Sequence, residues 1–170
     1  LDSVPEPFRL EGAIDGSFGP LQKRSMNLKG SLESQWVCRS SGINRPYRYE
    51  NELERDQTPD EKNALWAKNK IDQLARDNTE SPFFFAIGFV RPHTPLHVPA
   101  RWFNLYESDS FSMPVQRKHD CDDTYLDQQF IPSHKGFYRY QQLISSYQTE
   151  EEGLRAWVQA YLASVSAVDA

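Results

Sequence analysis

The sequence predicts an α/β fold of which this chain holds one part, and three observations lead to that prediction. The apolar run Phe83–Val90 has no alternating polar positions, which is typical of a strand buried on both faces of a parallel sheet. A helical pattern precedes it, so that helix and strand form half of a βαβ unit. Apolar residues gather at 83–90, 100–106 and 154–168, which suits a portion of a larger fold better than a self-contained domain.

The first predicted helix begins at Thr58. Before it, residues 1–57 show no sustained period and are divided by glycines, so we expect a loop-rich region there. The segment Thr58–Glu61 combines an N-cap threonine, a proline at the first helical position and a glutamate that closes a capping box. Apolar residues then recur at helical spacing until about Asn78. Residues 58–106 are therefore predicted as helix, strand and a following loop.

The remaining chain predicts two more helices. Residues 99–106 favour a short helix whose aromatic residues pack inward, and residues 107–148 indicate a long excursion interrupted by proline and glycine. A second capping box at Thr149 opens a last helix over 149–170. Its pattern continues to the final residue without a stop signal, which indicates a truncated helix. The apolar stripe of this helix is Leu154, Trp157, Val158, Tyr161, Leu162, Val165 and Val168.

Composition narrows the possible partners. The net charge of −5 argues against nucleic acid or an anionic membrane as a partner, and no apolar run approaches the 18 residues of a membrane-spanning helix. Cys38 and Cys121 lie far apart in sequence, and whether they pair stays open. No signal peptide pattern is present, so the sequence does not indicate a compartment.

The loop after the predicted strand is the main candidate site. It carries Arg91, His93 and His97, and open parallel sheets bind ligands just beyond the carboxyl ends of their strands. The two histidines have the spacing of a helical metal pair, but Pro95 and Pro99 make a regular helix there unfavourable. A guanidinium beside an imidazole is suited to hold an oxyanion such as sulfate, phosphate or carboxylate. Structural imidazoles in a loop are the alternative.

No metal site is predicted. His119, Cys121, Asp122 and Asp123 are possible ligands, but no second ligand pair and no twelve-residue calcium loop accompanies them. We interpret this stretch as a solvated acidic loop. The sequence also lacks the phosphate-binding, zinc-protease and serine-hydrolase motifs, and no nucleophile stands beside a base.

The residues around this loop resemble a known family. Residues 81–106, with the sequence SPFFFAIGFVRPHTPLHVPARWFNLY, resemble an internal segment of the sulfatase family, in which a P-F-F-L-A-V-G-F strand leads into [KR]-P-H-x-P. The subgroup that contains iduronate-2-sulfatase and choline sulfatase is the most similar. Tyr161–Asp169 resembles the family's Y-x-A-S-V-S-x-x-D helix. The resemblance covers residues 58–106 and 149–170.

This resemblance implies an alkaline-phosphatase-like mixed sheet sandwiched by helices, with only a central portion present here. It implies hydrolysis of sulfate esters by a formylglycine, made from the cysteine or serine of C/S-x-P-x-R, with a calcium ion holding the sulfate. His93 occupies the position of a sulfate-contacting histidine, Arg91 the family's Lys/Arg position, and His97 is expected to line the substrate pocket. Neither cysteine of this sequence lies in C/S-x-P-x-R. The modification site and the calcium ligands are therefore expected outside this chain, which alone is predicted to be inactive.

Three functions remain open from the sequence. The first is part of a sulfatase acting on a sulfated carbohydrate or a small sulfate ester. The second is a phosphoester or phosphonate hydrolase of the same superfamily. The third is a non-catalytic oxyanion-binding module, since the nucleophile pattern is missing. The family is often secreted, periplasmic or lysosomal. We also expect the isolated chain to be marginally stable and prone to aggregate, because a strand such as 83–90 would have unpaired edges.

Overall fold

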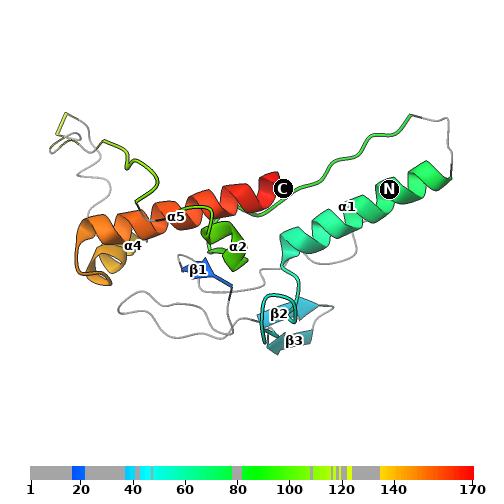
Figure 1. Cartoon of the computed structure of the whole chain (residues 1–170), viewed down its shortest axis with the longest axis horizontal. Helices are drawn as coiled ribbons and strands as arrows, with labels where there is room; N and C mark the ends of the chain where they lie inside the picture. Colours follow the sequence, from blue (N-terminus) through cyan, green and yellow to red (C-terminus); the bar gives the residue numbers. More distant parts are fainter. Residues whose placement is uncertain are drawn as a thin grey trace.

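The computed structural model describes residues 17–21, 37–40, 43–46, 48–77, 82–107, 109–115, 117, 119, 122–123 and 135–170. Figure 1 shows two long helices, α5 and α1. Helices α2 and α4 and strands β1 and β4 contact α5, whereas α1 lies beside an extended segment. The elements among the described residues are β1 (Phe18–Pro20), β2 (Val37–Ser40), β3 (Ile43–Pro46), α1 (Pro59–Arg76), β4 (Leu96–Val98), α2 (Ala100–Phe103), α4 (Lys135–Ser145) and α5 (Glu150–Asp169).

The three helices that the sequence predicts begin at the expected positions. In α1 the Thr58 side chain accepts from the amide of Glu61, and the Glu61 carboxylate accepts from the amide of Thr58 at 2.8 Å, which confirms the first capping box. Thr149 and Glu152 form the second box at the start of α5. The predicted short helix is α2. These starts are encoded locally, because each cap satisfies amides that the first helical turn leaves unpaired.

The core lies between α5 and a small parallel pair of strands. Phe18 of β1 is opposite Leu96 of β4, and the amide of Leu96 donates to the carbonyl of Ser17 at 3.0 Å. The ring of Phe18 meets that of Trp157 on α5 edge-on, with centroids 5.2 Å apart. Burial of these apolar side chains is the main source of stability for this part of the chain. The buried core residues are Phe18, Leu96, Val98, Phe103, Leu143, Ala160 and Ala163.

The buried face of α5 is rotated away from the stripe of large apolar residues. Ala160 and Ala163 are fully buried, whereas Tyr161 and Val165 of the predicted stripe are 46% and 41% exposed. Small side chains let the strands β1 and β4 and the helices α2 and α4 pack closely against α5. The large residues of the stripe are therefore partly left at the surface.

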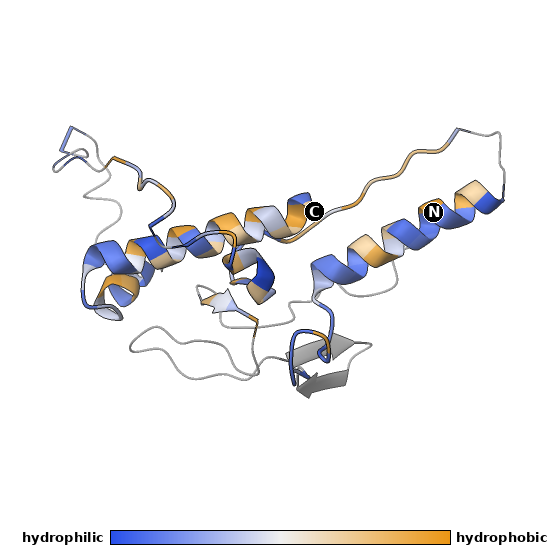
Figure 2. Cartoon of the chain, viewed as in Figure 1, coloured by the Kyte–Doolittle hydropathy of each residue, from blue (hydrophilic) through white to orange (hydrophobic). Residues whose placement is uncertain are grey.

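The predicted buried strand over 83–90 is wrong for the described chain. These residues run as an extended segment that belongs to no strand, and Phe83 and Phe84 are 61% and 94% exposed. Figure 2 shows the segment as an almost continuously hydrophobic trace. A strand needs a neighbour to pair its alternate N–H and C=O groups. Among the described residues no strand lies along this segment to provide that pairing.

Two stretches that the sequence predicts to be irregular contain a helix or short strands. Helix α4 lies within the predicted excursion 107–148 and places Leu143 in the core against α5. The loop-rich region 1–57 contains β1 and the antiparallel pair β2–β3. Strands of three or four residues are too short to show a period in the sequence, and tertiary pairing decides them instead.

Candidate functional site

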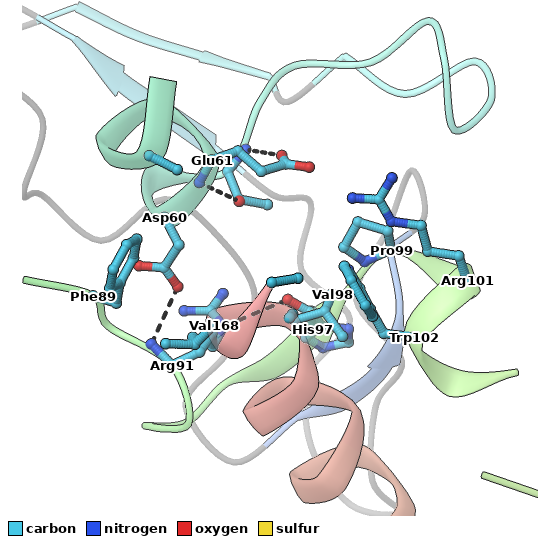
Figure 3. Close-up of a pocket in the computed structure, with 14 residues that line it drawn as sticks. Asp60, Glu61, Phe89, Arg91, His97, Val98, Pro99, Arg101, Trp102 and Val168 are labelled. Atoms are coloured by element: carbon cyan, nitrogen blue, oxygen red, sulfur yellow. Dashed lines mark hydrogen bonds between the residues drawn. The ribbon is translucent and has the colours of Figure 1, made fainter. Parts of the chain in front are cut away.

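A cavity of about 430 Å³ lies beside the candidate loop (Figure 3). Its walls come from the first turns of α1, from Phe89 and Arg91, from β4 and α2, and from the last turn of α5. Apolar walls such as Phe89, Trp102 and Val168 surround a few polar groups, which is the usual character of a ligand site. The polar lining residues are Thr58, Asp60, Glu61, Arg91, His97 and Arg101.

Arg91 is the most unusual residue of this cavity. Its side chain is only 8% exposed, and its Nε donates to the carbonyl of His97 at 3.4 Å. Within the described residues its two terminal nitrogens have no hydrogen-bond partner. Burial lowers the pKa of Arg91, while the nearby charge of Asp60 opposes that shift. A buried guanidinium whose terminal nitrogens are free can donate two parallel hydrogen bonds to one bidentate acceptor, and such charge-assisted bonds are strong.

The backbone that carries Arg91 is held by α1. The carboxylate of Asp60 accepts from the amide of Val90 at 2.7 Å and from the amide of Arg91 at 3.1 Å. The amide nitrogen of Asn63, one turn later, donates to the carbonyl of Gly88 at 3.1 Å. Positions three apart lie on one face of a helix, so both side chains reach the same segment. The segment 88–91 is thus attached to α1 by side chains rather than by strand pairing.

His97 is a buried structural histidine. Its side chain is fully buried, with Nδ1 2.9 Å from the carbonyl of Gly19 and Nε2 3.0 Å from the hydroxyl of Ser17. A carbonyl oxygen only accepts, so Nδ1 carries the proton and Nε2 accepts from Ser17. Burial lowers the pKa of His97 to about 4, and the charge of Arg91 also contributes to that lowering. The ring is therefore neutral at pH 7.

Gly19 has a conformation that favours this contact. Its φ of 127° lies in a region that side-chain-bearing residues rarely adopt, and its carbonyl oxygen accepts the hydrogen bond from Nδ1 of His97. The contact joins β1 to β4 alongside their backbone hydrogen bonds.

His93 lies at the surface. Its side chain is exposed, and its Nδ1 is 2.7 Å from the carbonyl of Thr94. It does not line the cavity of Arg91. Of the three residues that the sequence predicts for substrate binding, the structure brings Arg91 and His97 together and places His93 outside, on the same loop. The peptide bonds before Pro92 and Pro95 are both cis.

Other charges around the cavity are largely paired. Arg55 donates to both carboxylate oxygens of Glu61, at 2.8 and 2.6 Å. Burial on its own would raise the pKa of Glu61, but the hydrogen bonds from Arg55 and Thr58 outweigh it and lower the pKa. Arg101 stacks over the ring of Trp102, 4.7 Å from its centroid. Arg91 is the buried cation that faces the cavity.

The described residues do not offer a calcium site. In the part of the chain that is described, no group of three or more His, Cys, Asp or Glu side chains gathers to hold a metal ion. His119 Nδ1 lies 3.2 Å from the Asp122 carboxylate, and both side chains are more than 60% exposed. Cys121 and the side chain of Cys38 lie outside the described residues, so the structure does not test whether the two cysteines pair. None of the described helices combines the length and hydropathy needed to cross a bilayer.

Two residues of the site are not identified by the sequence analysis. Asp60 is read there only as part of a helix start, where acidic residues are common for electrostatic reasons. Ser17 lies in a region without a pattern. One sequence signal could have identified this face of α1. Asn63 is polar and lies on the same side of the helix as Asp60, and side chains of this kind often bond to backbone groups.

Comparison with known proteins points to one family. The chain is 38% identical over 65 residues to a protein named "Sulfatase" from Formosa agariphila, covering 38% of this chain and 12% of that protein. It is 34% identical over 77 residues to an "Arylsulfatase" from Clostridium perfringens, covering 45% of this chain and 14% of that protein. No family model and no solved structure matches.

These matches are partial, and each spans about an eighth of the curated relative's length. Both matched proteins bear sulfatase names, and the similarity to them supports a relationship to the sulfatase family. The described mixture of helices with a parallel strand pair is compatible with the α/β fold that the resemblance implies.

Proposed function

We propose that this chain is the oxyanion-holding portion of a sulfatase with an alkaline-phosphatase-like fold. The observation that carries the proposal is the buried guanidinium of Arg91, whose terminal nitrogens face a cavity without a partner among the described residues. The similarity to two proteins named as sulfatases supports sulfate as the anion. The substrate is then a sulfated carbohydrate or a small sulfate ester.

Arg91 and His93 have separate roles in this proposal. The guanidinium of Arg91 would donate two parallel hydrogen bonds to sulfate oxygens in a site shielded from water, where charge-assisted bonds are strong. The exposed imidazole of His93, on the same loop, would have to turn its Nδ1–H from the Thr94 carbonyl toward the sulfate to act as the second donor and stabilise charge on the transferring group. His97 forms the cavity wall, and its backbone carbonyl orients Arg91 through Nε.

The proposed role of this chain does not include the nucleophile or the calcium ion that the resemblance implies. C/S-x-P-x-R is absent from the 170 residues, and the described residues do not fit a calcium site. The proposed contribution of this chain is therefore binding and orientation of the sulfate group. By itself it is expected to bind sulfate without hydrolysing its esters.

Titration of the full 170-residue chain with sodium sulfate, followed by NMR at constant ionic strength, tests this function. Binding is expected with a Kd on the order of 1 mM. Arg91→Gln should weaken it about tenfold, and Arg91→Lys, which keeps the charge but loses the fork, by an intermediate factor. His93→Ala should weaken it about threefold. Arg76→Gln, on the exposed last turn of α1, is the control for net charge.

Equal sulfate affinity of wild type and Arg91→Gln, with Arg91→Lys also unchanged, would contradict the proposal. So would the lack of a saturable response in a wild-type chain that shows a cooperative thermal transition. Binding that falls equally in Arg76→Gln would indicate only a long-range charge effect.

A non-catalytic oxyanion-binding module is the second candidate function, and the missing nucleophile pattern favours it. Cys38 is followed by Arg-Ser-Ser-Gly and Cys121 by Asp-Asp-Thr-Tyr. Coding sequence beside these 170 residues separates the two: C/S-x-P-x-R in the same reading frame supports the sulfatase. Tighter binding of phosphate than of sulfate would instead favour the phosphoester hydrolases.

A further inference from the structure

We propose that Asp60 is the positioning residue of the oxyanion site, because its carboxylate fixes the backbone from which Arg91 enters the cavity. It accepts from two consecutive amides, those of Val90 and Arg91, at 2.7 and 3.1 Å. Its value for anion binding rests on the function proposed above. The attachment of the loop by Asp60 is a separate claim that can be tested without any anion.

The need for such a residue follows from the exposed segment before it. Residues 82–90 pair with no described strand, so their amides lack the partners that a sheet would provide. An unpaired backbone amide that is partly buried costs free energy comparable to a lost hydrogen bond. The two oxygens of Asp60 satisfy two such amides at once. The carboxylate thus replaces a neighbouring strand at the point where the segment becomes the loop.

Two further contacts from the same face of α1 hold the extended segment along the helix. Asn63 donates to the carbonyl of Gly88, and the ring of Trp66 stacks on Phe85 with centroids 5.2 Å apart. Asp60, Asn63 and Trp66 are spaced by three, so they form one stripe along the helix. Asp60 is the contact nearest to Arg91, which makes it the residue that controls the entry of that side chain.

Asp60 acts on an anion in two opposite ways. Its negative charge repels sulfate in the cavity that it lines, and it also helps Arg91 to keep its charge. Its hydrogen bonds hold the chain that presents Arg91. If charge alone mattered, removal of the carboxylate would strengthen sulfate binding. If positioning dominates, the same change weakens binding, so the sign of the effect distinguishes the two.

The decisive variant is Asp60→Asn in the full chain. The amide side chain keeps the shape but replaces one of the two acceptor oxygens by an NH₂ donor, so one of the two backbone amides would face a donor in the observed geometry. Hydrogen exchange followed by NMR should become about tenfold faster at the amides of Val90 and Arg91. Exchange at Ala160 and Ala163 in the core of α5 should change by less than about twofold. Sulfate affinity should fall about fivefold.

Two other variants complete the experiment. Asp72→Asn removes the same charge from an exposed position of α1, where Asp72 pairs with Lys68, and should leave both amides and the sulfate affinity unchanged. Asp60→Glu keeps both acceptor oxygens and should restore slow exchange at Val90 and Arg91 at least in part. Rescue by glutamate would separate positioning from general stabilisation of the helix start.

The outcomes decide the two proposals separately. Unchanged exchange at Val90 and Arg91 in Asp60→Asn would overturn the positioning role, whatever sulfate does. Tighter sulfate binding by Asp60→Asn would also overturn it, because charge would then outweigh geometry. If exchange accelerates as expected while wild type binds no sulfate, the attachment stands and the proposed oxyanion function fails.

Discussion

The imidazole of His97 accepts a hydrogen bond from the hydroxyl of Ser17 across 80 positions of sequence. The other ring nitrogen donates to Gly19, so one buried side chain joins β4 both to the residue before β1 and to the middle of β1. In the described chain this histidine belongs to the packing of the cavity wall, while Arg91 presents the charge.

Replacement of His97 should destabilise the protein more than replacement of His93. His97→Asn can retain a donor toward Gly19 but removes the 3.0 Å hydrogen bond between Nε2 and the Ser17 hydroxyl and creates a small void. We expect a loss of about 2 kcal/mol in the free energy of unfolding. His93→Ala changes an exposed side chain and should cost less than about 0.5 kcal/mol. Urea unfolding measures both, and similar losses would contradict the assignment.

The same histidine should make stability depend on pH. Its pKa is about 4 when folded and near 6.5 when unfolded, so the unfolded chain binds more protons between these values. Its contribution is complete above pH 6.5 and is lost as the pH falls toward 4, by up to about 3 kcal/mol. The difference in unfolding free energy between wild type and His97→Asn should shrink over this range. A constant difference from pH 7 to pH 4 would argue against a buried neutral ring.

Glu61 should matter through both its charge and its cap. Glu61→Ala removes the capping box of α1 and both hydrogen bonds from the mostly buried Arg55, with an expected loss of about 2 kcal/mol. Glu61→Gln keeps the acceptor for the Thr58 amide and should lose less. Because the pKa of Glu61 is lowered, its contribution is present above about pH 4.5 and disappears in acid. Far-ultraviolet circular dichroism during urea titration reports the helix directly.

The exposed apolar segment should promote self-association. Phe84 is 94% exposed within an extended stretch whose backbone pairs with no described strand, and such an edge can pair with a strand of another chain. Phe84→Lys should raise the monomer fraction in sedimentation experiments and change unfolding by less than about 0.5 kcal/mol. Leu53→Lys, at a position 95% exposed outside the segment, is the matched control. Equal benefit from both variants would mean that added charge alone improves solubility.

The helix starts could be predicted from the sequence because their signals are local. Thr58 with Glu61, and Thr149 with Glu152, satisfy neighbouring amides regardless of the rest of the chain. The run 83–90 has the composition of a buried strand, but composition does not provide the partner strands that would bury it. An apolar run without alternation therefore predicts that the segment can form a buried strand. Whether it does so depends on neighbouring strands that can pair with it.

The candidate site was only partly accessible to sequence reasoning. Arg91 could be placed in a binding loop because its neighbours include prolines and histidines that resemble a known segment. The different environments of His93 and His97 could not be predicted, since they depend on β1, which is 78 positions from β4. Asp60 could not be assigned to the site because an acid near a helix start already has a local explanation.

The parallel pairing of β1 with β4 also constrains the order in which the chain folds. Helices α4 and α5 are neighbours in sequence and make local contacts, whereas β1 can meet β4 only when the long stretch of chain between them, which includes β2, β3 and α1, brings its two ends together. Such closure is entropically costly and is completed late in proteins with distant contacts. The wall of the Arg91 cavity is therefore expected to form late in folding and to open early. Hydrogen exchange should be faster at His97 than at Ala160, and the reverse order would contradict this sequence of events.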